Sequence, residues 1–410
     1  MAERADGGLG VVIADAGARG AYEIGALSVL VPWLREHGVT PRVVVGTGAG
    51  AINAVLVAAL ASAPDPEAAA ELAVASWRSI GRADVFRSIA RSSPGLLTRY
   101  AATVLGLARL PLDSSFAVTG LLDPAPLLRT LRDLGPWHHL HAAVRSGVVR
   151  SVAVVTTSHS GGTTSVFVEA AADVPLPPDD AGQGIRYRRT RLTPEHVMAS
   201  AAVPPAFPPV HLPTTDDDGW HFDGGVRLNA PVKPSLDLGA DRLLVVATHP
   251  IPDAAAPPAD GCRSPDVVDV ATAILRSVLV DRMAQDVRSL DRVNRLVEAG
   301  GTGIGYRCVP YLFIAPDRPD TLGALAEEVL RDKYDGIPFP GSYDYTVLTR
   351  LLGGPGASHA ELMSFLLFDP DYIDLLVEAG QRDAAAAVRA ALPGDLFRPT
   401  RTQPGGGRAP

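Results

Sequence analysis

The chain has 410 residues, of which 47% are hydrophobic, and its formal net charge is −8. This acidic balance, without a dense basic run, argues against nucleic acid as the main partner. Two cysteines, Cys262 and Cys308, indicate a reducing compartment without a disulfide framework. No signal peptide precedes the first apolar run, so we expect a cytoplasmic protein.

The first unit of the chain is a strand, a glycine-containing loop and a helix. Residues 8–14 form a short apolar run that predicts a buried parallel strand. The loop Asp15-Ala16-Gly17-Ala18-Arg19-Gly20 follows. After it, apolar residues recur at helical spacing until His37-Gly38. Such a loop places backbone N–H groups and a helix N-terminus at one end of a sheet, which is a natural anion site.

Residues 42–63 form the second unit, in which an apolar β-branched run leads into Gly46-Thr47-Gly48-Ala49-Gly50 and then an Ala-rich run. We interpret this as a buried strand, a sharp turn and a buried helix. A membrane span is disfavoured because three glycines break the segment. The spacing Gly46-x-Gly48-x-Gly50 is that of a nucleophile elbow, whose middle residue points into a pocket. Here the middle residue is Gly48, which has no side chain.

The remaining pattern alternates between strands and helices and predicts an α/β fold, a mostly parallel sheet with helices on both faces. Residues 85–120 mix arginines with leucines and aromatics, and form either surface helices or a lid that faces a membrane. We expect further strands over 151–157, 163–168, 242–248 and 311–315, and helices over 67–82, 124–134, 193–201, 266–299, 319–333, 343–352, 358–367, 370–379 and 381–391. The predicted organisation is a core over 8–250, a mainly helical extension packed on it over 251–397, and a disordered tail over 398–410.

The order of motifs resembles the patatin-like phospholipase family. That family carries a G-G-G-x-[RK]-G loop, then G-x-S-x-G, then D-G-[GA]. Here the three places are residues 15–20, residues 46–50 and Asp223-Gly224-Gly225, with similar flanks around each. The resemblance covers most of residues 8–390, and the C-terminal third looks like the extension of many bacterial members. It implies a three-layer sandwich that hydrolyses acyl esters of lipids with a Ser–Asp dyad and uses no metal or cofactor.

The departures from the family pattern fall on the chemistry. Gly48 stands at the position of the family nucleophile, and Asp15 and Ala16 replace two glycines of the oxyanion loop, while the dyad aspartate is present as Asp223. Loss of a catalytic serine costs on the order of 10⁶ in kcat in another hydrolase. A carboxylate at position 15 would also oppose a developing oxyanion. Ordinary ester hydrolysis is therefore not expected. The resemblance implies these oxyanion or ligand-binding residues: Gly17, Ala18, Arg19, Gly20, Thr47 and Ala49.

The residues allow several roles. Thr47 as a substitute nucleophile is disfavoured, because it precedes the turn, and a water activated by Asp223 is geometrically open. Asp15 either caps a helix or faces Asp223 across the old site, where two carboxyl groups in an apolar pocket would serve as acid and base. Arg19 either pairs with a nearby carboxylate or fixes an acyl or phosphate group.

Other polar residues favour structural interpretations. His221, two residues before Asp223, is expected to pack, and Tyr22 and Glu23 to stabilise the first helix. The run Asp216-Asp217-Asp218 has no spaced partners and indicates a solvated loop rather than a metal site. Cys262 and Cys308 are expected to be bystanders.

Three hypotheses for the function follow. The first is a patatin-fold protein without hydrolase activity that binds an acyl- or lipid-like small molecule or an active partner enzyme. The second is a repurposed enzyme in which Asp15 and Asp223 transfer protons on an acyl- or polyketide-like molecule, in a cyclisation, isomerisation or elimination. The third is an engineered inactive variant of an active phospholipase. Peripheral contact with a membrane fits the first hypothesis, and the sequence leaves the oligomeric state open.

Overall fold

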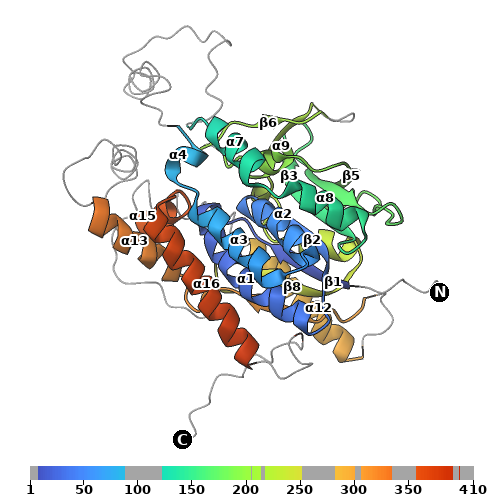
Figure 1. The fold of residues 1–410 in the computed structure, drawn as a ribbon. Helices are drawn as coiled ribbons and strands as arrows, with labels where there is room; N and C mark the ends of the chain where they lie inside the picture. Colours follow the sequence, from blue (N-terminus) through green and yellow to red (C-terminus); the bar gives the residue numbers. More distant parts are fainter. Residues whose placement is uncertain are drawn as a thin grey trace, which may run out of the picture.

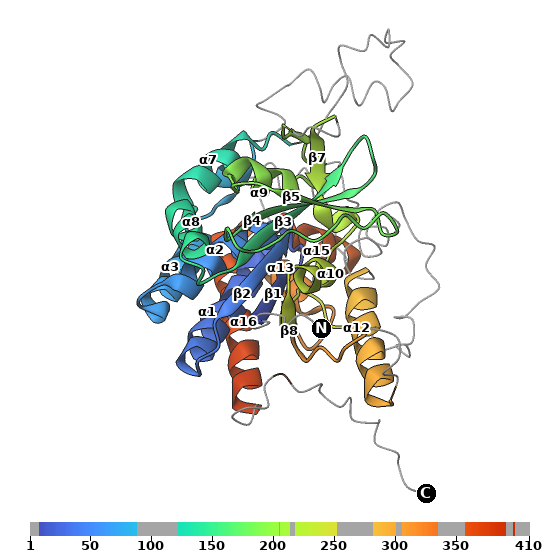
Figure 2. The same cartoon turned by 90° about the vertical axis from the view of Figure 1, so that its right-hand side faces the viewer.

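A mixed sheet lies at the centre of the molecule (Figures 1 and 2). The computed structural model describes residues 8–87, 122–204, 206–213, 218–251, 282–300, 306–334, 357–390 and 397. Within them the strand order is β5-β4-β3-β2-β1-β8-β9, with β7 paired to β3 and β6 to β7. The strands are β1 (Gly8–Ile13), β2 (Pro41–Thr47), β3 (Ser151–Ser158), β4 (Thr164–Ala170), β5 (Ile185–Arg189), β6 (Val210–His211), β7 (Trp220–Asp223), β8 (Ala240–Val246) and β9 (Tyr311–Ile314).

The central strands are parallel and buried on both faces. β1 pairs in parallel with β2 and β8, β2 with β3, and β8 with β9, whereas β3 pairs antiparallel with β4 and β7. Successive side chains of a strand point to opposite faces. Val11 and Ile13 accordingly belong to one apolar core, and Val12 to the other. Continuous apolar runs are what such doubly covered strands require.

Helices cover both faces of this sheet, as Figure 2 shows. The larger core holds side chains of α1, α2, α3 and α16, and the smaller one holds side chains of α10 and α12. The helices are α1 (Gly20–Glu36), α2 (Ala49–Ser62), α3 (Pro66–Arg78), α4 (Arg82–Val85), α7 (Ala125–Leu134), α8 (Trp137–Arg145), α9 (Pro194–Ser200), α10 (Val232–Asp237), α12 (Arg282–Glu298), α13 (Thr321–Tyr334), α15 (Ala357–Ser364) and α16 (Pro370–Ala390), with short 3-10 turns η1 (Gly17–Arg19) and η3 (Gly224–Val226).

The predicted fold class is confirmed: the sheet is mostly parallel, helices lie on both of its faces, and the C-terminal region is helical apart from β9. The domain boundaries remain a prediction. No helix within the described ranges is both long and apolar enough to cross a membrane. Residues 88–121, the first part of the helix expected over 266–299, the helix expected over 343–352 and the tail lie outside these ranges.

Several elements differ from the sequence prediction. The two helices expected over 370–379 and 381–391 are one helix, α16. Gly380 lies inside this helix and does not end it. A glycine is needed there because α16 crosses α1 so closely that a Cβ on Gly380 would lie 2.0 Å from the carbonyl oxygen of Tyr22. The sequence prediction also missed α8, α10, β5 and β6. β5 carries three arginines in five residues, which hides the alternation of buried Ile185 and Tyr187.

Candidate active site

The carboxyl ends of neighbouring strands bring the three motifs together. β1 ends just before Asp15, and β2 ends at Thr47, just before Gly48. In the sheet register Ile13 lies beside Gly46, and Thr47 lies beside Val155 of β3. The next residue of β3, Thr156, is paired with Asp223 at the end of β7. In open α/β sheets ligands bind at this edge, so the motifs meet where a site is expected.

Gly48 has the geometry of a nucleophile elbow. Its φ of 59° and ψ of −130° suit glycine and strain other residues. A Cβ on Gly46 would lie 2.2 Å from the carbonyl oxygen of Gly50, so the strand and helix approach closely here. The backbone N–H of Gly48 donates to Ser200 Oγ at 2.9 Å, and Ser200 donates to the carbonyl of Val155 at 2.6 Å. Sequence reasoning missed Ser200, whose only signal is its position in α9, shortly before the third motif.

Asp15 occupies the space that a side chain at position 48 would need. A Cβ built on Gly48 would lie 1.8 Å from Asp15 Oδ1 and 2.7 Å from Asp15 Cβ. Real Cβ atoms do not approach other atoms so closely. The backbone N–H of Asp15 donates to Asn229 Oδ1 at 2.8 Å, which fixes the start of the loop. Gly48 and Asp15 therefore fit each other, and neither position can be understood alone.

The carboxylate of Asp15 is held by backbone amides. Ala49, the first residue of α2, donates its N–H to Asp15 Oδ1 at 3.1 Å. Burial raises the pKa of Asp15, and hydrogen bonds from the amides of Ala49, Ala16 and Gly17 oppose that shift. These are amides of the oxyanion loop and of the elbow. The predicted helix-capping role thus holds in altered form, since Asp15 caps α2 rather than the helix that follows it in sequence.

Asp223 lies against Asp15 and is fully buried. Burial, and next the charge of Asp15, raise the pKa of Asp223 well above its usual range. Asp223 Oδ1 accepts from the N–H of Gly225 at 2.5 Å, whereas Oδ2 has no hydrogen-bond partner among the described residues when both carboxyl groups are ionised. A proton on Asp223, donated to Asp15, satisfies both groups. This arrangement is a carboxylic acid beside a carboxylate, as expected for the facing pair.

Arg19 points away from this pair into a buried ion cluster. Its side chain is fully buried, and its guanidinium forms an ion pair with Glu361 at 2.9 Å. Nε donates to Ser364 Oγ at 2.8 Å. Of the two roles expected for Arg19, the structure shows pairing with a carboxylate. The partners could not be found from sequence because they lie more than three hundred residues downstream.

The other expected ligand-binding residues provide no alternative nucleophile. Thr47 is fully buried, and its Oγ1 has no hydrogen-bond partner among the described residues, so no base there activates it. The N–H of Ala18 donates to the carbonyl of Phe365 at 2.9 Å. Gly20 packs against the indole of Trp77, which would lie 2.6 Å from a Cβ at this position.

Two residues on α1 have structural contacts, as expected. Tyr22 donates to Asp383 of α16 at 2.7 Å. Glu23 is fully buried, and its Oε2 accepts from Asn53 Nδ2 at 3.0 Å. Glu23 Oε1 has no partner among the described residues, and burial raises the pKa of this carboxyl well above its usual range. Glu23 is thus a third buried acid near the pair, and the charge of Asp15 adds to the rise in the pKa of Glu23.

None of the remaining candidates that the structure describes takes part in the site. His221 is buried, with Nδ1 3.1 Å from Thr156 Oγ1 and its ring edge-on to Phe167, so it is a packed histidine. Asp216 and Asp217 lie outside the described ranges, while Asp218 accepts from the N–H of Trp220. Cys262 also lies outside them, and Cys308 is half-buried. No group of three or more His, Cys, Asp or Glu side chains in the described part of the chain could hold a metal ion.

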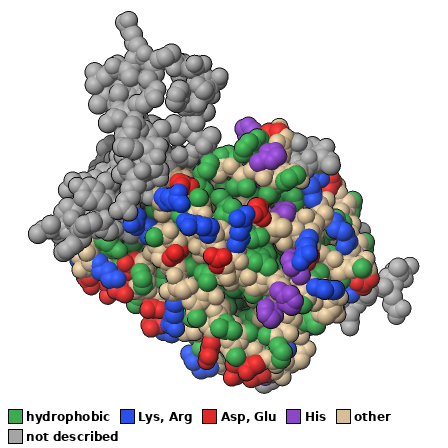
Figure 3. Space-filling view, turned by 45° about the horizontal axis from the view of Figure 1, so that its top comes forward, with side chains coloured by type: hydrophobic (Ala, Val, Ile, Leu, Met, Phe, Trp, Pro, Cys, Tyr) green, Lys and Arg blue, Asp and Glu red, His purple; other side chains and the backbone are tan. Residues whose placement is uncertain are grey.

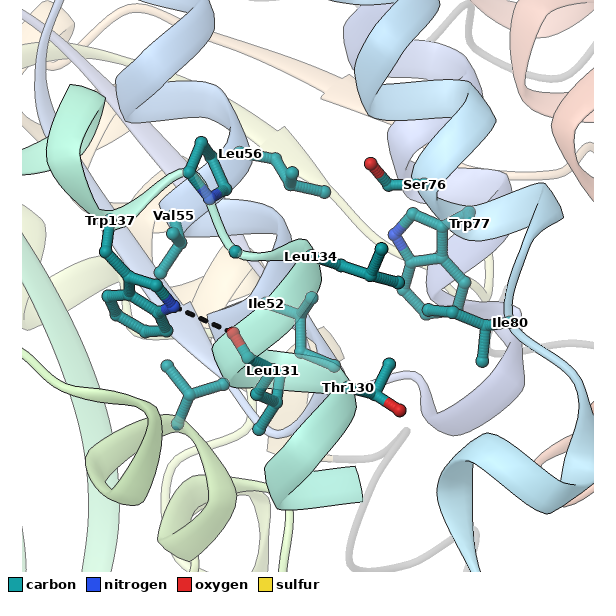
Figure 4. A pocket seen from close by; sticks show the side chains of 13 residues that line it. Ile52, Val55, Leu56, Ser76, Trp77, Ile80, Thr130, Leu131, Leu134 and Trp137 are labelled. Atoms are coloured by element: carbon teal, nitrogen blue, oxygen red, sulfur yellow. Dashed lines mark hydrogen bonds between the residues drawn. The ribbon is translucent and has the colours of Figure 1, made fainter. Parts of the chain in front are cut away.

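A small apolar pocket, partly open to solvent, lies between α2, α3 and α7 (Figure 4). Ile52 and Val55 of α2, Trp77 of α3 and Leu131 of α7 contribute to its walls. The indole N–H of Trp137 donates to the carbonyl of Leu131, so this polar group is already satisfied. The buried acids do not line this pocket. On the face drawn in Figure 3, basic and acidic side chains are interspersed over the surface.

Comparison with known proteins identifies the family. The family model described as "Patatin-like phospholipase" matches residues 12–236, which include all three motifs. No functionally curated protein matches the sequence. Among solved structures, VipD from Legionella pneumophila is 12% identical, with a TM-score of 0.27, over 94% of this chain and 75% of VipD. The ExoU–SpcU complex of the type III secretion system of Pseudomonas aeruginosa is 14% identical, with a TM-score of 0.26, over 93% of this chain and 76% of that chain. The family model covers more than half of the sequence, and the chain therefore belongs to the patatin-like phospholipase family.

Proposed function

We propose that this chain is a patatin-fold protein that does not hydrolyse esters through a Ser–Asp dyad. One observation carries the proposal: Asp15 Oδ1 would lie 1.8 Å from a Cβ on Gly48. The carboxylate therefore takes the place of the nucleophile's side chain and accepts from the elbow amide of Ala49. The loop and elbow amides that would stabilise an oxyanion already hold a negative charge. A substrate carbonyl would therefore meet neither a nucleophile nor free N–H donors of this loop and elbow.

The fit between Asp15 and Gly48 also bears on the alternative of an engineered serine replacement. Replacing a serine alone would leave the neighbouring loop shaped for that serine. Here the loop residue fills the vacated space, and a tightly filled site supports two residues that belong together.

An acyl- or lipid-like molecule remains the ligand that we propose. The apolar pocket runs along α2, the helix that begins at the elbow. Val197 of its wall belongs to α9, whose Ser200 contacts Gly48. Apolar walls favour a hydrocarbon chain through removal of apolar surface from water.

An esterase assay tests the proposal. Purified wild-type protein should not turn over p-nitrophenyl butyrate or p-nitrophenyl decanoate above the rate of the buffer. The Asp15→Gly/Gly48→Ser protein restores both the hydroxyl and its space, and should gain turnover that Asp223→Asn then abolishes. The Gly48→Ser protein alone is the matched control, because Asp15 still blocks its side chain. Wild-type turnover that is lost in Asp223→Asn would overturn the proposal.

A second candidate function is proton transfer by Asp15 and Asp223 on an acyl- or polyketide-like molecule. It is favoured by the arrangement of a raised-pKa acid beside a carboxylate, which is the combination that acid–base chemistry uses. The test is the cellular activity of Asp15→Asn and Asp223→Asn proteins in a strain lacking the wild-type gene. Full activity of both variants would eliminate this candidate, whereas a loss in both, with the fold intact, would support it.

A further inference from the structure

A segment near the C-terminus closes over the glycine-containing loop. We call residues 361–365, the last turn of α15 and the residue after it, the strap. The N–H of Ala18 donates to the carbonyl of Phe365 at 2.9 Å. The same carbonyl lies so close to Gly17 that a Cβ there would approach it to 2.5 Å. The strap therefore contacts the backbone of the loop directly.

Arg19 anchors the strap from the loop side. Its Nη2 lies 2.9 Å from Glu361 Oε2, its Nε donates to Ser364 Oγ, and its guanidinium stacks over the Phe365 ring at 4.2 Å. Arginine stays charged in proteins, and a fully buried charge needs partners. The described partners of Arg19 are the strap and one histidine, His249. The charge of Arg19 can therefore stay buried only while the strap is in place.

The strap and the candidate site share one turn of backbone. The amides of Ala16 and Gly17 are directed to the carboxylate of Asp15, and the next amide, that of Ala18, is directed to the strap. Arg19 completes the same three-residue 3-10 turn, η1. A change in the strap therefore moves the amides that hold Asp15 beside Gly48.

His249 gives this arrangement two competing states. Its Nε2 lies 2.8 Å from Arg19 Nη1 and 2.7 Å from Glu361 Oε1. Arginine only donates, and an ionised glutamate only accepts. With the proton on Nδ1, Nε2 accepts from Arg19 and its lone pair faces Glu361. With a proton on Nε2, it donates to Glu361 and its N–H faces Arg19. The two short contacts cannot both be hydrogen bonds in either state.

We propose that the strap is a pH-responsive clasp on the loop that carries Asp15, with His249 as the group that opens it. Neutral His249 can accept from Arg19 and leave the ion pair between Arg19 and Glu361 intact. Protonated His249 donates to Glu361 and places a second positive charge beside Arg19. It then competes for the carboxylate and repels the guanidinium, so acid loosens the clasp.

The groups that face His249 set this direction. Among the described residues they include Arg19 from η1, Glu361 from α15 and the neighbouring Thr248, whose Oγ1 lies 3.4 Å from Nδ1. The Phe365 ring stacks on the imidazole, and Tyr372 of α16, a neutral phenol with its pKa raised by burial, lies next to Arg19 and Glu361. Burial raises the pKa of Glu361, but the hydrogen bond with His249 and the charge of Arg19 outweigh burial and hold this pKa at about 2, so the carboxylate stays charged while histidine titrates.

Hydrogen–deuterium exchange tests the clasp in the full chain. Exchange of the peptide spanning residues 14–20, corrected for the intrinsic rate, should rise on the order of tenfold between about pH 8 and about pH 5, the range in which histidine changes its charge. The His249→Gln protein should lose this response, because an amide can accept from Arg19 and donate to Glu361 at once. The Glu361→Gln protein should exchange faster at both pH values.

The matched control is Asp369→Asn. It breaks the contacts of Asp369 with Lys333 and Tyr334, which lie in the same C-terminal region but outside the strap. A wild-type loop whose exchange does not change with pH would overturn the inference, and so would an equal response in His249→Gln or an Asp369→Asn protein that matches Glu361→Gln. The inference rests on the proposed function, because the loop that the clasp controls is the one that carries Asp15. Exchange needs no substrate, so ester turnover by the wild type would refute that function without affecting this result.

Discussion

Replacing Gly48 by serine puts a side chain where the carboxylate of Asp15 now lies. The new Cβ would meet Asp15 Oδ1 at 1.8 Å and Asp15 Cβ at 2.7 Å. The serine would also have to adopt a φ of 59°. The substitution therefore carries two separate costs, one from the backbone and one from the neighbour.

The two costs differ in size, and only one of them involves Asp15. A non-glycine residue in a sparsely populated backbone region costs about 1–3 kcal/mol. Displacing Asp15 from the Ala49 N–H breaks a hydrogen bond to a charged group, worth about 1.5–3 kcal/mol. We expect Gly48→Ser to lower the free energy of unfolding by about 2.5–6 kcal/mol. The second cost is the loss of the same hydrogen bond that Asp15→Gly removes, so the sum of the two single effects should exceed the effect of the double variant by about 1.5–3 kcal/mol.

A double-mutant cycle measured by urea unfolding checks this value. The four proteins are the wild type, Asp15→Gly, Gly48→Ser and the double variant. The double variant should be more stable than the sum of the single effects predicts. Asp15→Ala/Gly48→Ser is a graded control, because it keeps the Cβ of residue 15 at 2.7 Å from the new Cβ and should depart less from additivity.

Additivity within about 0.5 kcal/mol would refute the claim that Asp15 fills the place of the side chain at position 48. If Gly48→Ser alone does not fold, the comparison of Asp15→Gly with its double variant still applies. Their difference should then equal the backbone cost alone, about 1–3 kcal/mol. A larger difference would show that a residue other than Asp15 blocks the site.

Three further predictions use the same measurement. Because the pKa of Asp223 is raised in the folded state, the stability of the wild type should fall as pH rises from about 4 toward that folded pKa. The Asp223→Asn protein should not show this loss, and at pH 8 it should be more stable than the wild type by about 1 kcal/mol or more. Equal pH profiles of the two proteins would contradict a raised pKa. Glu23→Gln should likewise be more stable than wild type at pH 8 but not at pH 4, and a constant difference would rule out titration as the cause. Ser200→Ala leaves the buried N–H of Gly48 unpaired and should cost about 1–3 kcal/mol, whereas Ser76→Ala on an exposed helix face should stay within about 0.5 kcal/mol; similar losses would refute a supporting role for the Ser200 hydroxyl.

Local patterns in the sequence were sufficient to predict the central strands and the elbow. The β-branched run before Gly46 and the Ala-rich run after Gly50 predict a buried strand and helix because burial on both faces demands continuous apolar residues. Interruptions of those patterns caused the errors. Gly380 looked like a helix end, whereas its cause is the close approach of α1 and α16.

The sequence by itself determined the family motifs, their order and the absence of a side chain at position 48, because these depend only on residue identity and spacing. The tertiary structure decided what replaces that side chain. Asp15 and Ala49 are 34 residues apart, and Arg19 and Glu361 are 342 residues apart, so no local pattern links them. Only the parallel register of β1 with β2 brings the Asp15 loop to the elbow, and only the packing of the C-terminal region brings the strap to Arg19.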